Sequence, residues 1–572
     1  MDTFTPTTDP LVGSIALSAI VALLPLVTFF IMLAVVKAKA HVSGLTSLAV
    51  AILVAIFVFK MPVGMTLMSG VMGAVFGAFP VVWIVIMAIW LYQITVVSGR
   101  FEDLRRVFDV IGGGDVRIQS ILIAFCFGGL LEALAGFGAP VAITATMLLA
   151  LGMSPLRAAA AVLVANTAPV AFGAVAIPIT TAASLTGLDA NHIGAIVGHQ
   201  APILALFVPT LLLFIIDGKR GVKEVWPAAL VIGATFAVTQ FLCATYFSYE
   251  LTDIVASLAG LGAAVIFLRF WSSKGREAAR ERIMVGGTNG TTGGSAGITT
   301  TYDESNRKLL PGPTFLALFP YLLVIIIFGI AKLWTIGVSV PAVLGSTDVK
   351  VQWPLLYGHI LDAGGNPVTS TVYNFQWLSN PGTLLLFTGL IVAVVYSIFD
   401  GGGKYKIKVS RAVAEIWHTL YRMRWAATTI LSVLALAYVM NLSGQTITIG
   451  TWLAGTGAFF AFLSPILGWI GTAVTGSDTS ANALFANLQQ TAGINAGIDP
   501  NLLVAANTSG GVVGKLISPQ NLAIAATAVG MEGKESVILK KVAGWSVGML
   551  LILCVLVYLQ STPVLSWMLP TP

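Results

Sequence analysis

Apolar segments, each about the length that a helix needs to cross a bilayer, recur from one end of the chain to the other. One crossing takes about 20 residues. Clear candidates are 14–36, 42–59, 80–98, 193–216, 225–247, 251–270, 314–335, 382–399, 425–441 and 542–560. Charged residues make up only 9% of the chain, whereas soluble domains carry about 25%. The sequence therefore predicts an all-α polytopic membrane protein.

Basic residues gather in short loops between these segments, which is the pattern of cytoplasmic loops. The net charge of +6 therefore points to membrane topology and not to a nucleic-acid partner. Lys37, Lys39 and His41 follow the first apolar segment and no basic residue precedes it, so we expect a retained first span with the N-terminus outside. By the same rule, the connections 271–312 and 400–424 are expected inside and 336–381 outside.

No motif for an enzyme, a metal or a nucleotide is found along the chain. The three cysteines lie in apolar runs without metal-ligand spacing, and no cofactor or metal is expected. The glycine runs 112–114 and 401–403 lack the Lys-Ser/Thr of a phosphate-binding loop. Neither His-Glu-x-x-His nor Gly-x-Ser-x-Gly occurs. The chain is thus expected not to be an enzyme and not to use ATP by itself.

Two parts of the chain resemble each other. "VANTAPVAFGAVAIP" at 164–178 matches "AANTSGGVVGKLISP" at 505–519 at Asn, Thr, Gly and Pro, with an offset of 341. Upstream, "AGFGAP" at 135–140 falls opposite "TGSDTS" at 475–480, and Ser98-Gly99 falls opposite Ser443-Gly444. Several landmarks in the same order over about 80 residues indicate an internal repeat.

Charge parity predicts that the two copies are inverted. Segment 118–152 must enter from the inside and return for Arg157 to stay inside. Segment 447–492 must enter and return from the outside for Lys540 and Lys541 to end inside. Inverted repeats with broken helices that meet at the midplane are typical of secondary transporters. "LLEALAGFGAP" at 130–140 is then the turn of a re-entrant hairpin, whose glycines Gly136 and Gly138 let the backbone approach a solute.

Two further stretches differ from the clear candidate spans. We interpret 64–79 as interfacial or partly inserted, because one more full crossing would place the basic loops that follow it on the outside. Stretch 410–421 is either an amphipathic helix on the membrane surface or a solvated basic loop.

Polar residues at matched positions of the two copies are candidate ligands for a carboxylate. Asn166 and Thr167 in the first copy match Asn507 and Thr508 in the second, where Ser509 follows. Each group interrupts an apolar segment near a proline, and broken helices expose backbone N–H groups at a positive helix end. The alternative is that these side chains only bond to neighbouring helices. The presence of two copies at inverted positions favours a ligand site.

Three charged residues lie at membrane depth, where charges are expensive and mark function. Lys515 stands where the first copy has Ala174, and it would supply the counter-charge of an organic anion. The alternative is that the long Lys515 side chain extends to the cytoplasmic surface of the membrane. Glu132 and Asp478 lie in the two hairpins, where either could carry a proton, hold Na⁺ or pair with a basic residue. We prefer Asp478 as the proton carrier, displaced from Lys515 when the anion binds.

The motifs "LLEALAGFGAPVAI" (130–143), "ANTAPVAFGAVAIP" (165–178), "GSDTSANALFANLQ" (476–489) and "GVVGKLISPQNLAIA" (511–525) resemble the lactate permease family of bacterial membrane transporters. The resemblance covers almost the whole chain except the low-complexity stretch 284–301 and the external loop. It implies proton symport of L-lactate, D-lactate and glycolate across the bacterial plasma membrane, and an elevator-type fold. Gln520 belongs to the last motif and joins the expected substrate ligands.

These expectations divide the chain into six regions. They are N-terminal spans (1–117), a first transport core (118–216), connecting spans (217–270), a cytoplasmic linker (271–312), spans with the two loops (313–424), and a second transport core with the last span (425–572). The expected partners are a small-molecule substrate, protons and membrane lipid, and a homodimer is compatible with the sequence. A sodium-coupled transporter of other organic anions, or a cation antiporter of the same architecture, is the alternative.

Overall fold

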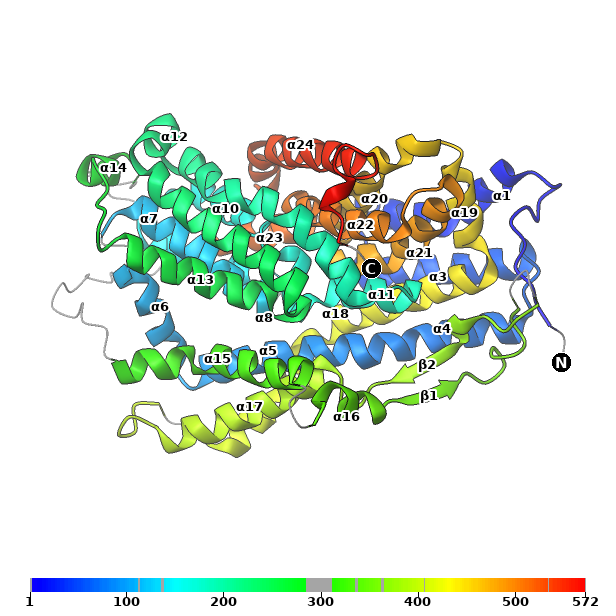
Figure 1. The fold of residues 1–572 in the computed structure, drawn as a ribbon, viewed down its shortest axis with the longest axis horizontal. Coiled ribbons are helices and arrows are strands. Elements are labelled where there is room, and N and C mark those ends of the chain that lie inside the picture. The colour runs from blue at the N-terminus through cyan, green and yellow to red at the C-terminus, as the bar shows by residue number, and fades with distance from the viewer. Residues whose placement is uncertain are drawn as a thin grey trace.

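The protein is described by a computed structural model over residues 3–111, 114–134, 138–283, 311–334, 338–361, 365–405, 407–532 and 534–570. Within these residues, eleven helices are long and apolar enough to cross a membrane, or twelve if one bent pair counts as a single span. The predicted polytopic helical protein is therefore confirmed. Figure 1 shows the helices packed roughly along the long axis of the molecule.

The helices of the first part surround a broken-helix core. They are α1 (Ile15–Ala22), α2 (Leu24–Ala34), α3 (Ala40–Phe57), α4 (Val63–Phe76), α5 (Trp83–Val97), α6 (Arg100–Ile111), α7 (Val116–Ile121), α8 (Gly128–Leu134), α9 (Ala139–Ala150), α10 (Pro155–Ala165), α11 (Gly173–Thr186), α12 (Ala190–Tyr246) and α13 (Thr252–Phe267). Helix α12 is broken at Gly218 into two antiparallel legs, which touch where Gly198 meets Ala244.

The second part begins with the linker 271–312, which contains α14. Its elements are α14 (Arg276–Ile283), α15 (Pro311–Leu333), α16 (Val340–Ser346), β1 (Val349–Gln352), β2 (Val372–Phe375), α17 (Pro381–Ile398), α18 (Val409–Ser443), α19 (Gln445–Ala454), α20 (Phe460–Thr475), α21 (Asp478–Ala496), α22 (Pro500–Gly514), α23 (Pro519–Ala528) and α24 (Glu535–Gln560). Helix starts follow local chemistry. Asp499 caps α22 by accepting from the Asn501 amide, and Pro500 occupies the first turn.

Two helical hairpins overlap the predicted segments 118–152 and 447–492. Hairpin 1 runs from α7 through a π-helical stretch (Leu122–Phe127) into α8 and returns as α9, so that Thr144 packs beside Gly128. Hairpin 2 consists of α20 and α21, and Gly471 of one leg touches Phe485 of the other. Figure 1 places α7 toward the left end of the molecule and α19 toward the right end, with α8 and α22 between them.

The two repeat-related parts contain the same series of turns. Glycines with left-handed backbone follow corresponding helices in both, and they are Gly99 and Gly444, Gly138 and Gly476, Gly152 and Gly497, and Gly187 and Gly530. The packing is reciprocal as well, because α9 packs on α23 while α21 packs on α11, and α12 packs on α22 while α24 packs on α10. An approximate two-fold relation between the parts would produce such exchanged pairs.

Four details differ from the sequence expectations. Segment 64–79 is not a separate interfacial element, since α4 packs at Gly73 on the backbone of Leu434 and continues into α5 with a break at Phe79. Stretch 410–421 is the first third of the continuous helix α18. Hairpin 2 begins at Phe460, and α19 is a separate helix. The external loop holds an antiparallel β1–β2 pair, so the described chain is not purely helical.

Helices α20 and α22 cross in very close contact through glycines. A Cβ on Gly510 would collide with the carbonyl of Pro465, and a Cβ on Gly514 would collide with that of Trp469. On the opposite side, Gly468 lies directly on the Asn507 carbonyl. Small residues spaced four apart allow this approach between helix backbones in membrane proteins. The crossing fixes where the end of α22, and thus Lys515, lies.

Substitution of Gly510 by Ala is expected to destabilise the fold by about 1–3 kcal/mol, because the added methyl group has no space against the α20 backbone. Thermal unfolding of the purified protein in detergent measures the effect. Gly548→Ala is the matched control, since nothing lies within 4 Å of its Cβ position. It is expected to leave the melting temperature unchanged or to raise it. Equal effects of the two substitutions would contradict the close crossing.

Cysteine labelling tests whether the hairpins enter from opposite faces. Gly114 and Ser154 flank hairpin 1, whereas Thr456 and Asn495 flank hairpin 2, and none of the four is buried. Single cysteines at these positions, in a background without the three buried native cysteines, are expected to react pairwise with an impermeant reagent. The first pair should react from one face of the membrane and the second pair from the other. Labelling of Gly114→Cys and Ser154→Cys from different faces would show that hairpin 1 crosses the membrane.

Candidate functional site

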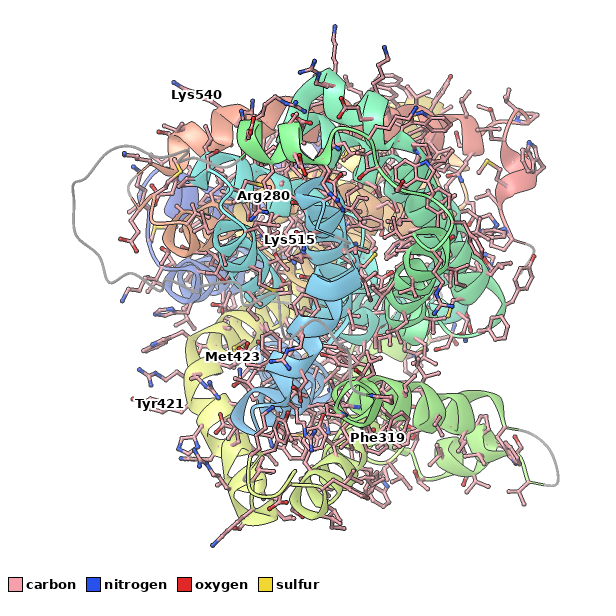
Figure 2. All side chains as sticks on the ribbon, turned by 90° about the vertical axis from the view of Figure 1, so that its left-hand side faces the viewer. Arg280, Phe319, Tyr421, Met423, Lys515 and Lys540 are labelled. Atoms are coloured by element: carbon pink, nitrogen blue, oxygen red, sulfur yellow. The ribbon has the colours of Figure 1, made fainter. Side chains whose placement is uncertain are left out.

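Lys515 lies at the break that follows helix α22. The helix ends at Gly514, residues Lys515–Ile517 form a 3₁₀ turn, and Pro519 begins α23. The carbonyl of Lys515 accepts hydrogen bonds from the Ser518 hydroxyl (3.0 Å) and the Asn521 amide (3.1 Å). The residue as a whole is only 6% exposed. The lysine is therefore held inside the protein and does not reach a surface, which excludes the alternative raised for it from sequence. In Figure 2 Lys515 lies among the helices, whereas Lys540 lies at the edge.

The charge partner of Lys515 is Glu132 of hairpin 1. The Lys515 Nζ donates to Glu132 Oε1 at 2.6 Å, and Glu132 is 2% exposed. The second oxygen, Oε2, accepts from Asn166 Nδ2 at 2.9 Å. These three residues come from hairpin 1, from the first broken helix and from the second broken helix. The buried pair thus joins the two repeat-related parts at one point.

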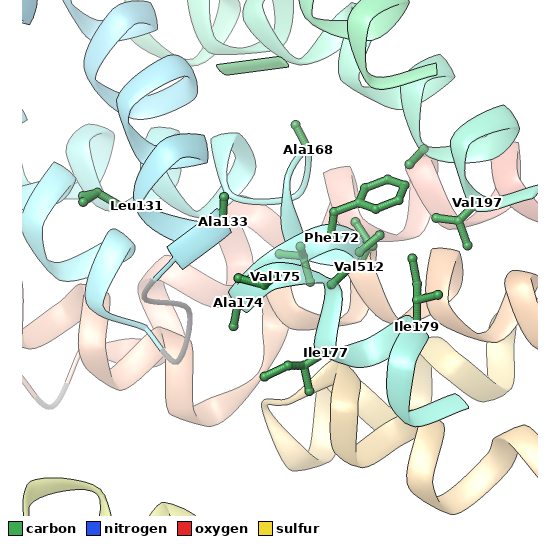
Figure 3. Packing of buried hydrophobic residues seen from close by; sticks show 14 of the residues in the cluster. Leu131, Ala133, Ala168, Phe172, Ala174, Val175, Ile177, Ile179, Val197 and Val512 are labelled. Carbon is green, nitrogen blue, oxygen red and sulfur yellow. The ribbon is translucent and has the colours of Figure 1, made fainter. Parts of the chain in front are cut away.

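The backbone beside this pair has an unusual conformation. Ala174, Val175 and Ala176 all have left-handed backbone, with φ of 45°, 59° and 55°. This conformation costs roughly 1–2 kcal/mol for each residue with a side chain. Figure 3 shows the apolar side chains around the break, among them Phe172, and Val512 from α22. Packing holds this strained segment in place next to the charges, as is found at functional sites.

Gly173 precedes this strained segment and lies against the carboxylate. A Cβ at Gly173 would come within 3.0 Å of Glu132 Oε1, so a larger residue would push the carboxylate away from Lys515. The sequence repeat matched Gly173 with Gly514, which also lies at a close backbone contact.

A small cavity of about 30 Å³ adjoins the pair, and Asp478 lines it together with Glu132 and Lys515. Asp478 is 3% exposed, and its Oδ1 accepts from Thr472 Oγ1 at 3.4 Å. Its Oδ2 has no hydrogen-bond partner among the residues that the structure describes. The expected Asp478–Lys515 ion pair is not formed, because Lys515 is paired across the repeats with Glu132. The site nevertheless combines one ammonium group with two carboxyl groups.

The polar residues of the second copy bond elsewhere. Asn507 Nδ2 and Thr508 Oγ1 both donate to Asn482 Oδ1, at 3.0 and 3.1 Å, and Ser509 Oγ donates to Gln200 Oε1 at 2.6 Å. All three side chains are buried and do not line the small cavity. Their contacts agree with the alternative weighed from sequence, bonding between neighbouring helices. Asn166 alone of the matched amides reaches the charge pair.

The remaining expected residues do not contact the charge pair where the structure describes them. Thr167 donates to the Val164 carbonyl. Gly138 has left-handed backbone and lies on Ile524, Gln520 lies on Gly476 at the turn of hairpin 2, and Gly136 is outside the described residues.

Sequence reasoning missed a buried polar bridge behind the site. Gln240 Nε2 donates to the Ala168 carbonyl (3.1 Å) and to Asp253 Oδ1 (2.9 Å), and both side chains are completely buried. The bridge supports the broken stretch that follows Asn166 and Thr167. A carboxylate inside the apolar run 251–270 was the signal that could have revealed it.

A buried charge pair at broken helices, in a polytopic protein, is typical of membrane transporters. The family model of L-lactate permease matches residues 18–564, and the chain belongs to this family. Its members transport solutes and do not catalyse reactions.

Three relatives show how far the similarity extends. The chain is 42% identical to glycolate permease GlcA of Escherichia coli over 92% of each chain. It is 38% identical to L-lactate permease of Bacillus subtilis, with 98% of this chain and 99% of the relative covered. Identity to L-lactate permease of Escherichia coli is 40% over 98% of each chain. The relatives therefore match the whole architecture and not one motif.

Removal of either partner of the buried pair is expected to destabilise the protein by about 3–5 kcal/mol, because the other charge is left buried and uncompensated. The double variant Lys515→Met with Glu132→Gln should recover most of this loss. Thermal unfolding of the two single variants and the double variant in detergent measures the coupling. Additive losses would mean that the two side chains do not interact in the folded protein.

Proposed function

We propose that this protein imports L-lactate and related 2-hydroxy monocarboxylates, including D-lactate and glycolate, by proton symport across the bacterial plasma membrane. The observation that carries the proposal is the buried Lys515–Glu132 pair, which lines one small cavity with Asp478. Relatives named as lactate and glycolate permeases support the substrate class.

The substrate carboxylate replaces Glu132 as the partner of Lys515. One ammonium group matches one carboxylate, so a monocarboxylate fits better than a dicarboxylate. The Asn166 amide, freed from Glu132, can then donate to the substrate carboxylate or its 2-hydroxyl group. Ser477 and Thr479 add hydroxyl groups to the same cavity. A cavity of about 30 Å³ holds little more than water, so lactate enters only when the Glu132 side chain swings aside or hairpin 2 opens.

Charge balance explains why a proton accompanies the anion. We take Glu132 to neutralise Lys515 in the empty site, where the two side chains form an ion pair. We take Asp478 to be uncharged, because a buried carboxylate without a cation in contact is expensive. When lactate takes over Lys515, the displaced Glu132 carboxylate is left without a partner in an apolar environment. An unpaired buried charge is expensive, so Glu132 takes up one proton. One lactate and one proton then cross together, and the site is neutral in both states. Glu132 thereby takes the role of displaced acid that the sequence had assigned to Asp478.

Inverted repeats and an elevator-like movement complete the proposal. The paired left-handed glycines and the reciprocal packing of α9 with α23 and of α21 with α11 support the repeat. Hairpin 1 would then enter from the cytoplasm and hairpin 2 from the outside, with the N-terminus outside. The site would lie between the two hairpin turns, where movement of the core exposes it to each side in turn.

Transport by reconstituted variants tests the coupling. Glu132→Gln is expected to exchange labelled lactate for lactate but to lose accumulation driven by an inward proton gradient, because the amide cannot take up a proton. Asp478→Asn, which resembles the uncharged acid, should keep accumulation within about threefold, a change of about 0.7 kcal/mol. Lys515→Ala should abolish both activities.

Wild-type uptake in proteoliposomes with an imposed pH gradient, with and without Na⁺, is the reference measurement. Lactate accumulation that requires Na⁺ would show that sodium, and not the proton, is the coupling ion. Equilibration of lactate without accumulation would indicate a channel. Loss of accumulation in Asp478→Asn, with Glu132→Gln intact, would assign the proton to Asp478.

A further inference from the structure

A second, larger cavity adjoins the site. It has a volume of about 750 Å³, and its walls are the α2–α3 loop around Lys39, helix α18 around Trp425, and the turn of hairpin 2 with Gln520. Gly476 and Ser477 line both this cavity and the small one that contains Lys515. We call the larger cavity the basic vestibule.

The basic vestibule carries positive charge. Lys37 and Lys39 are exposed in the α2–α3 loop, and both line the cavity. His41 stacks on Trp425 with 4.4 Å between ring centres, and the Arg424 guanidinium lies 5.5 Å from the same Trp ring. Among the described residues that line it, none is Asp or Glu. A cleft with charges of one sign raises the local concentration of ions of the opposite sign.

Hydroxyl and amide groups make the wall next to the site suitable for a small carboxylate. Thr475, Ser477, Ser480 and Gln520 lie on this wall. A Cβ on Gly476 would come within 2.5 Å of Gln520 Oε1, so this side chain lies directly on the turn between the two cavities. A carboxylate that moves from Lys515 into the basic vestibule passes Gln520. It therefore contacts the hydroxyl groups of this wall before it reaches the two lysines.

The cavity beside the N-terminal segment has a different character. Its volume is about 180 Å³, and Tyr438, Asn441, Asn487 and Gln490 contribute to its lining. Among its described lining residues, none is Lys, Arg, His, Asp or Glu. One cavity therefore attracts anions and the other is electrostatically neutral. By the distribution of basic loops, the basic vestibule faces the cytoplasm.

We propose that the basic vestibule is a second, weak binding station for small carboxylates, which holds released lactate near Lys515 and makes the carrier sensitive to internal product. The inference rests on the proposed function. Because the two lysines are exposed to solvent, the station adds little affinity and depends strongly on salt. Its consequence is kinetic, since internal lactate rebinds readily and slows net uptake.

The test compares half-saturating lactate concentrations at each face of oriented proteoliposomes. The double variant Lys37→Gln with Lys39→Gln is expected to raise the value at the vestibule face about three- to tenfold at low ionic strength. The value at the opposite face should remain that of the wild type, and inhibition of uptake by internal lactate should weaken in parallel. Near 1 M salt, where the screening length is about 3 Å, wild type and variant should coincide.

Two matched variants serve as controls. Lys540→Gln with Lys541→Gln removes two exposed lysines that do not line the basic vestibule, and it should leave both half-saturating concentrations unchanged. Lys37→Arg with Lys39→Arg keeps the charge and should behave as the wild type. If the Lys540 and Lys541 substitutions changed the half-saturating concentrations equally, the effect would come from general surface charge. That outcome would overturn the proposal.

Lipid headgroups are the other anions that could occupy the basic vestibule. Vesicles of phosphatidylcholine alone and vesicles with added phosphatidylglycerol separate the two sources. An effect of the double variant that appears only with the anionic lipid would overturn the carboxylate station. Wild-type protein that transports no lactate would contradict the proposed function itself. Active wild type with an unchanged double variant would contradict only the present inference.

Discussion

The ion pair between Lys515 and Glu132 is the constraint on which the rest of the core depends. Two opposite charges inside an apolar protein are tolerated only in close contact and with their remaining hydrogen-bonding capacity largely satisfied. The 2.6 Å separation and the Asn166 amide meet these conditions. Because the partners lie 383 positions apart in the chain, the pair can form only when hairpin 1 and the end of α22 have folded against each other. The helix breaks make this contact possible, because they place backbone turns and polar groups beside the Lys515–Glu132 pair.

Close packing holds those breaks in place. Glycines at the α20–α22 crossing remove the side chains that would hold the two backbones apart, and this fixes the end of α22. On the other side, three residues in left-handed conformation carry the chain past Glu132 under apolar side chains. Such a segment persists only where its surroundings over-determine it. Backbone strain and close packing are thus concentrated next to Lys515 and Glu132, the two side chains that a substrate would have to separate.

The sequence predicted most of the spans, two hairpin segments and the helix breaks, because hydrophobic length, glycine and proline act locally. It left open whether Lys515 is buried or reaches the cytoplasmic surface. It did not predict the partner of Lys515. A repeat offset aligns equivalent residues, but it does not say which residues of the two copies contact each other. Asp478, in the same copy as Lys515, was therefore as suitable a partner for the lysine as Glu132. The matched Asn166 and Asn507 each bond to the hairpin of their own copy, but the hairpin residue is Glu132 in one case and Asn482 in the other. Only Asn166 therefore reaches the charge pair. The continuity of 410–421 with α18 was hidden because a helix that leaves the membrane keeps its hydrogen bonds while its composition changes.

The arrangement of charges also bears on direction. A site that is neutral both empty and with lactate plus one proton carries no net charge through the protein, so the membrane potential does not oppose either form. The chemical gradients of lactate and protons then set the direction of net transport, and the carrier itself is reversible. In such a carrier, any asymmetry between the faces must lie outside the binding site. In the proposed mechanism, the basic vestibule at one face and the uncharged cavity at the other would supply this asymmetry. Affinity at each face would then change through exposed lysines, while Lys515, Glu132 and Asp478, to which we assign specificity and coupling, remain as they are.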